Sequence, residues 1–265
     1  MAVYSSRDTL SFMMTFKDEA EFKSSCGYEI EGIWYPRVTK IVDIKSKPAL
    51  YRFYASVGYM RALEISEKSA EEGTAVHAAV ERLLTGQKAG EVPASIGASV
   101  YAFLNFMREN KIQVDPVHVE RRAVSEEHRY AGTIDSLAVI DGKFGVLDIK
   151  TSAGIYRDYD LQTAAYFQAL KKEFPELSTR WILRIDQNQK CAACNATRRV
   201  KGGREKIKKN SKKLCGNFSH QWQEPEGVVE LKEITSDPEH DFAAFLGAKK
   251  LWEWENKPWL DLVGY

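Results

Sequence analysis

The fold of this chain is organised by residues 130–150, which read Tyr130-Ala-Gly-Thr-Ile-Asp-Ser-Leu-Ala-Val-Ile-Asp-Gly-Lys-Phe-Gly-Val-Leu-Asp-Ile-Lys150. Two apolar runs rich in β-forming residues flank the dipeptide Asp141-Gly142. This dipeptide favours a two-residue type I′ turn, because both central residues of that turn need a positive φ, which Asp and Gly tolerate. The stretch therefore predicts a β-hairpin in which Ile140 faces Lys143.

The register of this hairpin brings two acidic side chains together. Counting back from the turn places Asp135 directly opposite Asp148, and opposed side chains lie roughly 4.5–5.5 Å apart at their Cβ atoms. Lys150 points to the same face as Asp148, since side chains alternate along a strand with a period of two. Like charges so placed repel each other, so we expect a compensating cation beside them. The alternative is a charged hairpin face that is simply solvated.

An Asp–Asp–Lys group of this kind suits metal-assisted hydrolysis. Two carboxylates can share a divalent cation, which polarises a phosphoryl oxygen and lowers the pKa of a bound water. The ammonium group of the lysine can orient that water or stabilise developing charge. Asp135, Asp148 and Lys150 are therefore candidate catalytic residues.

The composition is that of an ordinary globular protein. Of the 265 residues, 44% are hydrophobic and 28% are charged, which is enough for a buried core. No stretch approaches the roughly 20 apolar residues of a membrane span. The first residues also lack the charged-then-apolar layout of a secretory signal. We expect an intracellular, cytoplasmic protein with no membrane partner.

Positive charge is concentrated in one segment. Residues 198–213 contain nine Lys or Arg residues and one acidic residue, so this segment carries +8 while the whole chain carries +1. Such a segment can bind phosphates without sequence preference, although a solvated loop would have the same composition. The candidate nucleic-acid-binding residues are Arg198, Arg199, Lys201, Arg204, Lys206, Lys208 and Lys209.

Four cysteines are present, at positions 26, 191, 194 and 215. The pattern Cys191-x₂-Cys194-x₂₀-Cys215-x₄-His220 has the ligand count and paired spacing of a structural zinc site. Free thiols are an alternative. The basic segment lies between these candidate ligands, so a bound metal would tether it at both ends.

Periodicity and turn signals predict a mixed α/β protein. The predicted helices cover residues 38–44, 48–57, 72–84, 96–110 and 159–172, with another beginning at residues 236–239, and the predicted strands outside the hairpin cover residues 116–125, 179–186 and 228–234.

Four polar residues on these elements are candidates for a site. His77 lies at the edge of the apolar stripe of the 72–84 helix, where a packing role is the alternative to a ligand role. Glu120 can point towards the acidic pair if its predicted strand neighbours the hairpin. Gln162 and Tyr166 are four residues apart, so they share one face of their helix.

Five motifs in this order resemble those of a known nuclease family. They are Gly73-Thr-Ala-Val-His77, Glu120, Gly132-Thr-Ile-Asp135, Leu147-Asp-Ile-Lys-Thr151 and Gln162-Thr-Ala-Ala-Tyr166. Together they resemble the RecB-like branch of the PD-(D/E)XK nuclease superfamily, over residues 38–185. Relatives in that branch include nuclease domains of bacterial recombination helicase–nucleases, CRISPR-associated adaptation nucleases and mitochondrial genome maintenance exonucleases.

The resemblance implies a role for each matching residue. It implies metal ligation by His77, Asp135, Asp148 and the backbone carbonyl of Ile149, catalysis by Lys150, and support of the site or the nucleic acid by Gln162 and Tyr166, with Glu120 as a looser match. Hard oxygen ligands favour Mg²⁺ or Mn²⁺, and an imidazole ligand tilts the choice towards Mn²⁺. The chain departs from the superfamily's name by having Ile134 before Asp135 and an aspartate at position 148.

The same branch offers a second interpretation of the cysteines. Some of its members hold an iron–sulfur cluster with one cysteine before the histidine helix and three near the C-terminus. Cys26, Cys191, Cys194 and Cys215 follow that order, but the long gap before Cys215 departs from the compact spacing of those relatives.

The resemblance implies a restriction-endonuclease-like mixed central sheet with flanking helices and a cysteine-bearing insert. The predicted organisation is an N-terminal segment (residues 1–37), a nuclease core (38–186), a zinc-binding basic insert (187–226) and a C-terminal strand and helix that complete the core (227–265). The predicted activity is that of a metal-dependent deoxyribonuclease, an exonuclease or single-strand-directed enzyme that acts on single-stranded DNA or DNA with free ends. The alternatives are a non-catalytic zinc-containing nucleic-acid-binding module and an iron–sulfur nuclease of a repair or CRISPR assembly.

Overall fold

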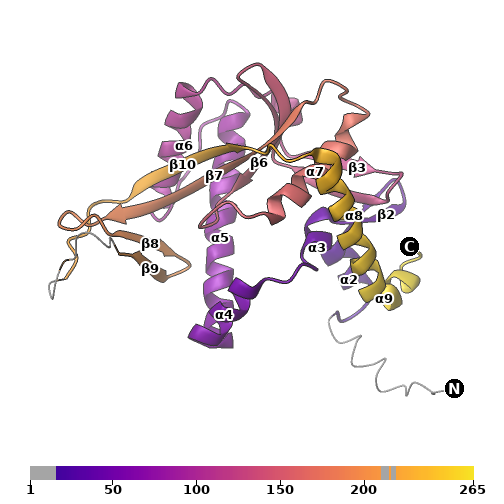
Figure 1. The fold of residues 1–265 in the computed structure, drawn as a ribbon, viewed down its shortest axis with the longest axis horizontal. Coiled ribbons are helices and arrows are strands. Elements are labelled where there is room, and N and C mark those ends of the chain that lie inside the picture. The colour runs from indigo at the N-terminus through magenta and orange to yellow at the C-terminus, as the bar shows by residue number, and fades with distance from the viewer. Residues whose placement is uncertain (1–15, 210–214, 216–218) are drawn as a thin grey trace.

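A computed structural model of the chain describes residues 16–209, 215 and 219–265 (Figure 1). The first part of the predicted N-terminal segment and the end of the basic segment therefore lie outside the described residues.

The helices are α2 (Glu19–Cys26), α3 (Val38–Val42), α4 (Pro48–Val57), α5 (Tyr59–Leu84), α6 (Gly97–Glu109), α7 (Asp158–Lys171), α8 (Pro238–Glu255), α9 (Lys257–Leu262) and the short 3₁₀ helix η2 (Pro116–His118). The strands are β1 (Gly27–Ile30), β2 (Ile33–Pro36), β3 (Arg121–Ser125), β4 (Tyr130–Ile134), β5 (Ser136–Ile140), β6 (Lys143–Lys150), β7 (Thr179–Lys190), β8 (Thr197–Lys201), β9 (Arg204–Lys208) and β10 (Glu226–Glu233). Apart from the differences described below, the predicted helices and strands are confirmed, with small differences at their ends.

The predicted hairpin is formed by β5 and β6. Ile140 pairs with Lys143, and the φ angles of Asp141 and Gly142 are 50° and 77°, as a type I′ turn requires. Strand β6 continues into a central sheet in which it runs parallel to β7, and β7 runs antiparallel to β10. The sheet is therefore mixed, which confirms the predicted α/β class.

Helices cover both faces of this sheet (Figure 1). On one face, α5 and α6 pack on β6 through an apolar cluster that includes Leu147 and Ile149. On the other face, α7 and α8 belong to a second cluster that includes Val146. Because side chains alternate along β6, Asp148 lies on the same face as Val146, beneath α7.

The predicted strand over residues 116–125 is wrong in its first half. Residues 116–118 form the 3₁₀ helix η2, because Pro116 occupies a helix-starting position and the Asp115 carboxylate accepts a hydrogen bond from the backbone N–H of Val117 at 3.0 Å. Strand β3 begins only at Arg121. Glu120 therefore lies in the turn before the strand, with a φ of 50°.

Helix α5 begins thirteen residues before the predicted start at residue 72. Its first half buries few side chains, among them Ala62 and Ile65, so its apolar stripe is weak in the sequence. This half is rich in residues that favour helix, such as Ala, Leu, Glu, Lys and Met. Propensity, rather than periodicity, was the signal for this part of the helix.

The basic segment forms an antiparallel hairpin of β8 and β9. Gly202 and Gly203 form its turn, with φ angles of 59° and 72°. A Gly-Gly pair favours a two-residue hairpin turn, which the sequence interpretation did not use. The flanking runs are mostly Lys and Arg, so the strand signal beside this turn is weak. The last residues of β7 pair with β8, so this hairpin extends from the end of the central sheet (Figure 1).

Within the described part of the chain, no helix combines the length and the apolar character needed to cross a membrane.

Candidate active site and cysteine–histidine cluster

A cavity of about 760 Å³ opens beside the end of β6. It gathers most of the predicted site residues from four parts of the chain. Its lining includes His77 from α5, Asp135 from the β4–β5 junction, Asp148, Ile149 and Lys150 from β6, and Gln162 and Tyr166 from α7.

Asp135 lies where the chain passes from one sheet to another. Ile134 pairs with β3, whereas Ser136 pairs with Leu147 in the central sheet. The β5–β6 pairing thus ends one residue before the predicted Asp135–Asp148 pair. The Asp135 carboxylate instead accepts a hydrogen bond from the backbone N–H of Ile149 at 2.6 Å, which keeps it beside Asp148.

Asp148 is almost completely buried, with 2% of its surface exposed. Its Oδ1 atom accepts a hydrogen bond from Nε2 of Gln162 at 3.1 Å. Its Oδ2 atom lies 2.7 Å from Nζ of Lys150 but out of alignment for a hydrogen bond. Burial raises the pKa of the Asp148 carboxyl to about 6, against the lowering effect of the Lys150 charge.

Lys150 remains positively charged in this environment. Burial lowers the pKa of its ammonium group, but the charges of Asp148 and Asp135 outweigh burial, so the net shift is upward. The group also donates a hydrogen bond to Oε1 of Gln162 at 3.1 Å and lies 4.9 Å from the centre of the Tyr159 ring. Lys150 is thus held beside Asp148 by an amide and an aromatic face.

Tyr159 is a site residue that the sequence interpretation missed. It lines the cavity and lies three residues before Gln162, on the same side of α7. This spacing, together with the identified Gln162 and Tyr166, was the available signal.

Gln162 and Tyr166 extend the hydrogen bonds from β6 into α7. Nε2 of Gln162 donates to the hydroxyl oxygen of Tyr166 at 3.1 Å as well as to Asp148. Burial raises the pKa of Tyr166 well above its ordinary value, so this phenol stays neutral. Gly132 lies against the Tyr166 ring, and a Cβ atom at this position would overlap it.

His77, Glu120 and Asp135 form a group that can hold a metal ion. One ligand atom from each lies within 4.8 Å of the others, and Nδ1 of His77 is 3.1 Å from Oδ1 of Asp135. Burial lowers the pKa of His77, but the hydrogen bond to Asp135 and its charge raise it by more. Desolvation and the charges of Asp135 and Glu81 raise the pKa of Glu120.

Asp148 lies outside this group, which consists of His77, Glu120 and Asp135. The buried Oδ2 atom of Asp148 has no hydrogen-bond partner among the described residues, although buried carboxylate oxygens are normally paired. The three ligand atoms of the group are two carboxylate oxygens and one imidazole nitrogen, which are common metal ligands.

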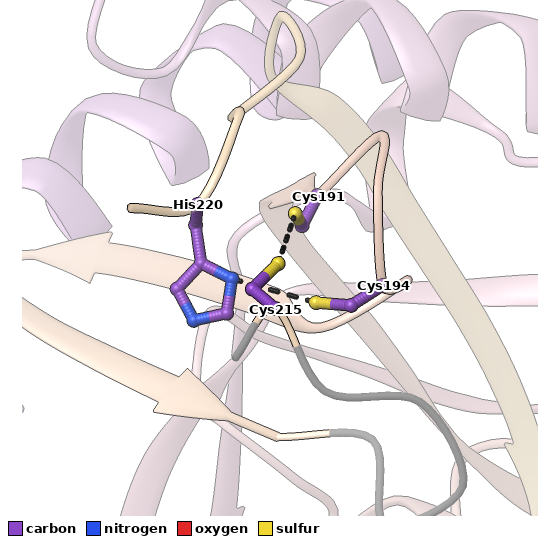
Figure 2. Close-up of side chains that lie close together, drawn as sticks. All are labelled: Cys191, Cys194, Cys215 and His220. Atoms are coloured by element: carbon purple, nitrogen blue, oxygen red, sulfur yellow. Dashed lines mark hydrogen bonds between the residues drawn. The ribbon is translucent and has the colours of Figure 1, made fainter. Parts of the chain in front are cut away.

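The predicted zinc ligands meet in a second place, at the end of β7. The Sγ atoms of Cys191 and Cys215 are 3.5 Å apart, and Sγ of Cys194 is 3.4 Å from Nδ1 of His220 (Figure 2). All four ligand atoms lie within 4.8 Å of one another. Ligands about 2.3 Å from a tetrahedral zinc are roughly 3.8 Å apart, so this group can bind such a metal.

The backbone around Cys191 and Cys194 folds into a tight turn. The N–H of Asn195 donates to the carbonyl of Cys191 at 2.9 Å, and Asn195 has a positive φ of 58°. The N–H of Cys191 donates to the carbonyl of Ala196 at 2.8 Å. Residues 191–195, with the pattern Cys-x-x-Cys-Asn, thus form a turn from which both thiols point to one side.

The thiols of the cluster differ in acidity. Burial raises the pKa of Cys191. Hydrogen bonds from the backbone N–H groups of Cys194 and Ala193 and from His220 have the larger, opposite effect and lower the pKa to about 5. Hydrogen bonding to Cys194 and burial raise the pKa of Cys215 to about 12. The thiolate is the form of cysteine that binds metal.

The hydrophobic cluster around these thiols is very small. Its buried residues are Cys191, Cys194 and Ala196, with Trp222 packed against them. Apolar contacts on this scale stabilise little structure, so small units of this kind usually depend on a metal. The composition of the cluster thus supports a bound metal such as zinc.

Cys26 takes no part in this cluster. It is buried in the main core near α2, together with Phe22 and Trp34. Figure 1 places α2 far from the end of β7. The structure therefore gathers three cysteines and one histidine, rather than the four cysteines expected for an iron–sulfur cluster.

The predicted nucleic-acid-binding residues divide into three groups. Arg199 and Lys201 line the cavity beside the end of β6. Lys206 and Lys208 line a smaller cavity of about 270 Å³, together with Arg199. The others lie apart: Arg198 is paired with Glu205 and stacked on Trp222, Arg204 is stacked on Phe53, and Lys209 is exposed at the end of β9.

No model of a known protein family matches the chain, and no curated protein matches it.

Proposed function

We propose that the chain is a metal-dependent deoxyribonuclease of the RecB-like branch of the PD-(D/E)XK superfamily, with a restriction-endonuclease-like fold. It hydrolyses phosphodiester bonds of DNA, as an exonuclease or as a single-strand-directed nuclease. The observation that carries this proposal is the meeting of His77, Asp135, Asp148 and Lys150 in one open cavity. The cavity also has Arg199 and Lys201 in its lining, as a polyanionic substrate requires.

His77, Asp135 and Asp148 are the proposed ligands of a Mg²⁺ or Mn²⁺ ion, with the carbonyl of Ile149 as a further donor and Glu120 close by. When bound, such an ion polarises a phosphoryl oxygen and activates a water for hydrolysis. The imidazole of His77 favours Mn²⁺ among these ions.

Lys150 stabilises the negative charge that develops on phosphate oxygens during hydrolysis. Its charged state follows from the carboxylates beside it, and its low exposure keeps water from screening that charge. Gln162 is a positioning residue, since it contacts both Lys150 and Asp148 through the two ends of one amide.

The cysteine–histidine cluster is the proposed site of a structural zinc ion. Its four protein ligands leave no open position for a substrate, which is typical of structural rather than catalytic zinc. Cys194 lies three residues before β8, and Cys215 follows the hairpin, so bound zinc would fix both ends of the basic segment.

The test is a cleavage assay with purified protein and Mg²⁺, Mn²⁺ or chelator. End-labelled linear and circular single-stranded DNA serve as substrates. We expect cleavage only with an added cation, and product lengths and the fate of the circle will distinguish an exonuclease from an endonuclease. DNA binding without cleavage under any of these conditions would instead support the non-catalytic binding module.

A further inference from the structure

We propose that one face of the β8–β9 hairpin is a track for the sugar–phosphate backbone of a DNA strand that leads into the active-site cavity. We call this surface the basic face, and its residues are Arg199, Lys201, Arg204, Lys206 and Lys208. The proposal deepens the proposed function, on which the direction of the track rests.

The strand register separates charge between the two faces of the hairpin. Arg199 is opposite Lys206, and Lys201 is opposite Arg204, and directly opposed residues share a face. Lys208 is on this face too, because it lies two residues from Lys206. Five of the six side chains on this side of the hairpin are therefore positive, and the sixth is Thr197, opposite Lys208.

The other face of the hairpin has no excess charge. Arg198 is opposite Ile207, and Val200 is opposite Glu205. The guanidinium of Arg198 is 3.0 Å from the Glu205 carboxylate, and the two remaining side chains are apolar. The hairpin residues whose charge forms no ion pair with a described residue are Lys201, Arg204, Lys206 and Lys208, and all four lie on the basic face, whereas Arg199 is paired with Asp186.

The basic face connects two cavities. Arg199 and Lys201 line the active-site cavity, while Arg199, Lys206 and Lys208 line the cavity of about 270 Å³. Both cavities also share Ala153 and Tyr156 in their linings, so they adjoin each other. A strand that binds Lys206 and Lys208 thus lies next to the entrance of the candidate active site.

Arg199 and Lys201 fix the hairpin to the catalytic strand. Arg199 forms two hydrogen bonds to Asp186, at 2.9 and 2.7 Å, and both residues donate to the carbonyl oxygen of Thr151. Thr151 directly follows Lys150. The position of the basic face is therefore tied to the position of the catalytic lysine.

Lys206 and Lys208 are available to a ligand. Both are exposed, and neither forms an ion pair with any residue that the structure describes. Lysines without partners on the same face as anchored arginines are suited to phosphate groups, because contacts of this kind position a strand without reading its sequence.

The test compares two charge reversals of equal size. The track variant is Lys206→Glu with Lys208→Glu. The control is Lys172→Glu with Lys250→Glu; Lys172 directly follows α7, Lys250 is in α8, and both are exposed. Binding of a labelled single-stranded oligonucleotide is measured by fluorescence anisotropy over a range of salt, with Lys150→Ala added to each protein to prevent cleavage. Melting temperature and zinc content verify that each variant is folded.

We expect the track variant to bind about tenfold more weakly, and its salt slope to fall by roughly 1.4, for two lost contacts to a single strand. The control variant should bind within about twofold of the parent protein. Equal losses in both variants, or no loss in the track variant, would overturn the proposal. The milder variant, Lys206→Gln with Lys208→Gln, should also weaken DNA binding, by a smaller factor. It replaces the track variant if the charge-reversed protein does not fold.

A small phosphodiester separates the track from the active site. With Lys150 intact, the track variant should hydrolyse bis(p-nitrophenyl) phosphate at the parent rate but degrade DNA more slowly. If the parent protein cleaves DNA while the track variant binds and cleaves it normally, the proposed track is wrong and the proposed nuclease activity is supported. If the parent protein cleaves neither substrate while the track variant loses DNA binding, the DNA-binding role of the basic face is supported and the proposed nuclease activity is wrong.

Discussion

The ammonium group of Lys150 lies 2.7 Å from Oδ2 of Asp148, and only 18% and 3% of the two side chains are exposed. Burying two charges is unfavourable unless each is well compensated. Oδ1 of Asp148 accepts a hydrogen bond from Gln162, whereas Oδ2 has the Lys150 charge beside it but no hydrogen bond among the described residues. Groups with such shifted pKa values, next to an open cavity, are typical of functional sites.

Removal of the Lys150 ammonium should slow DNA cleavage strongly. We expect Lys150→Ala to reduce the rate by about 10²–10³-fold, the usual effect of losing one donor that stabilises a transition state. DNA binding should change little, because the proposed DNA contacts are on the basic face. Single-turnover cleavage of an end-labelled strand and anisotropy measure the two effects.

Lys143→Ala is the matched control for this variant, since Lys143 is in the same strand and pairs with Glu233 at 2.7 Å at the surface. An exposed pair contributes less than about 1 kcal/mol, so cleavage should stay at the parent rate. Asp148→Asn should be as inactive as Lys150→Ala, because it removes the carboxylate charge while keeping its shape. Full activity in either site variant would contradict the proposed mechanism.

Substitution of Gln162 should slow catalysis without weakening substrate binding. Gln162→Ala removes the hydrogen bonds that hold Lys150 and Asp148, and losses of such supporting residues typically reduce activity about 10–100-fold. We expect the decrease in kcat, with KM for DNA unchanged. Steady-state kinetics decide this, because a change confined to KM would mean that Gln162 contacts the substrate instead.

A side chain at position 132 should displace Tyr166. Gly132→Ala places a Cβ atom inside the space of the buried ring, and overpacking of this kind costs about 1–3 kcal/mol. Thermal or urea unfolding should show this loss together with lower activity. Gly154→Ala is the control, since a Cβ atom there has open space, and equal stability of the two variants would contradict the packing described here.

The sequence predicted the hairpin and its register well, because the Asp141-Gly142 turn is a local signal and fixes every pair that follows from it. The shared face of Gln162 and Tyr166 and the spacing of the cysteines are also local patterns. Local signals are therefore sufficient to predict the cavity residues on β6 and α7, although not the contacts between these two elements.

Features that depend on long-range contacts were not predicted. Asp135 leaves the hairpin because Ile134 pairs with a strand of another sheet, and nothing local marks that change. The approach of Arg199 to Thr151 joins segments 48 residues apart in the chain. Tertiary pairing of this kind is not encoded in periodicity, so the position of the basic face beside the cavity required the structure.

Loss of the zinc ligands should uncouple DNA binding from catalysis. We expect the parent protein to contain one zinc ion per chain, measured by elemental analysis, and Cys191→Ser with Cys194→Ser to contain none. Without that metal, the small apolar cluster around Trp222 cannot hold the ends of the basic segment. DNA affinity should therefore fall, while hydrolysis of bis(p-nitrophenyl) phosphate continues because the ligands of the active-site cation are on other elements.

Cys26→Ala provides the control for the zinc variant, since Cys26 is buried in the main core rather than in the cluster. This variant should retain zinc and DNA affinity, although the small cavity that it creates lowers the melting temperature slightly. An iron–sulfur protein would behave differently in two ways: the parent would be brown with visible absorption, and Cys26→Ala would lose the cluster. Either result would show that the bound metal is iron rather than zinc. It would also require Cys26 to lie near Cys191, contrary to the structure.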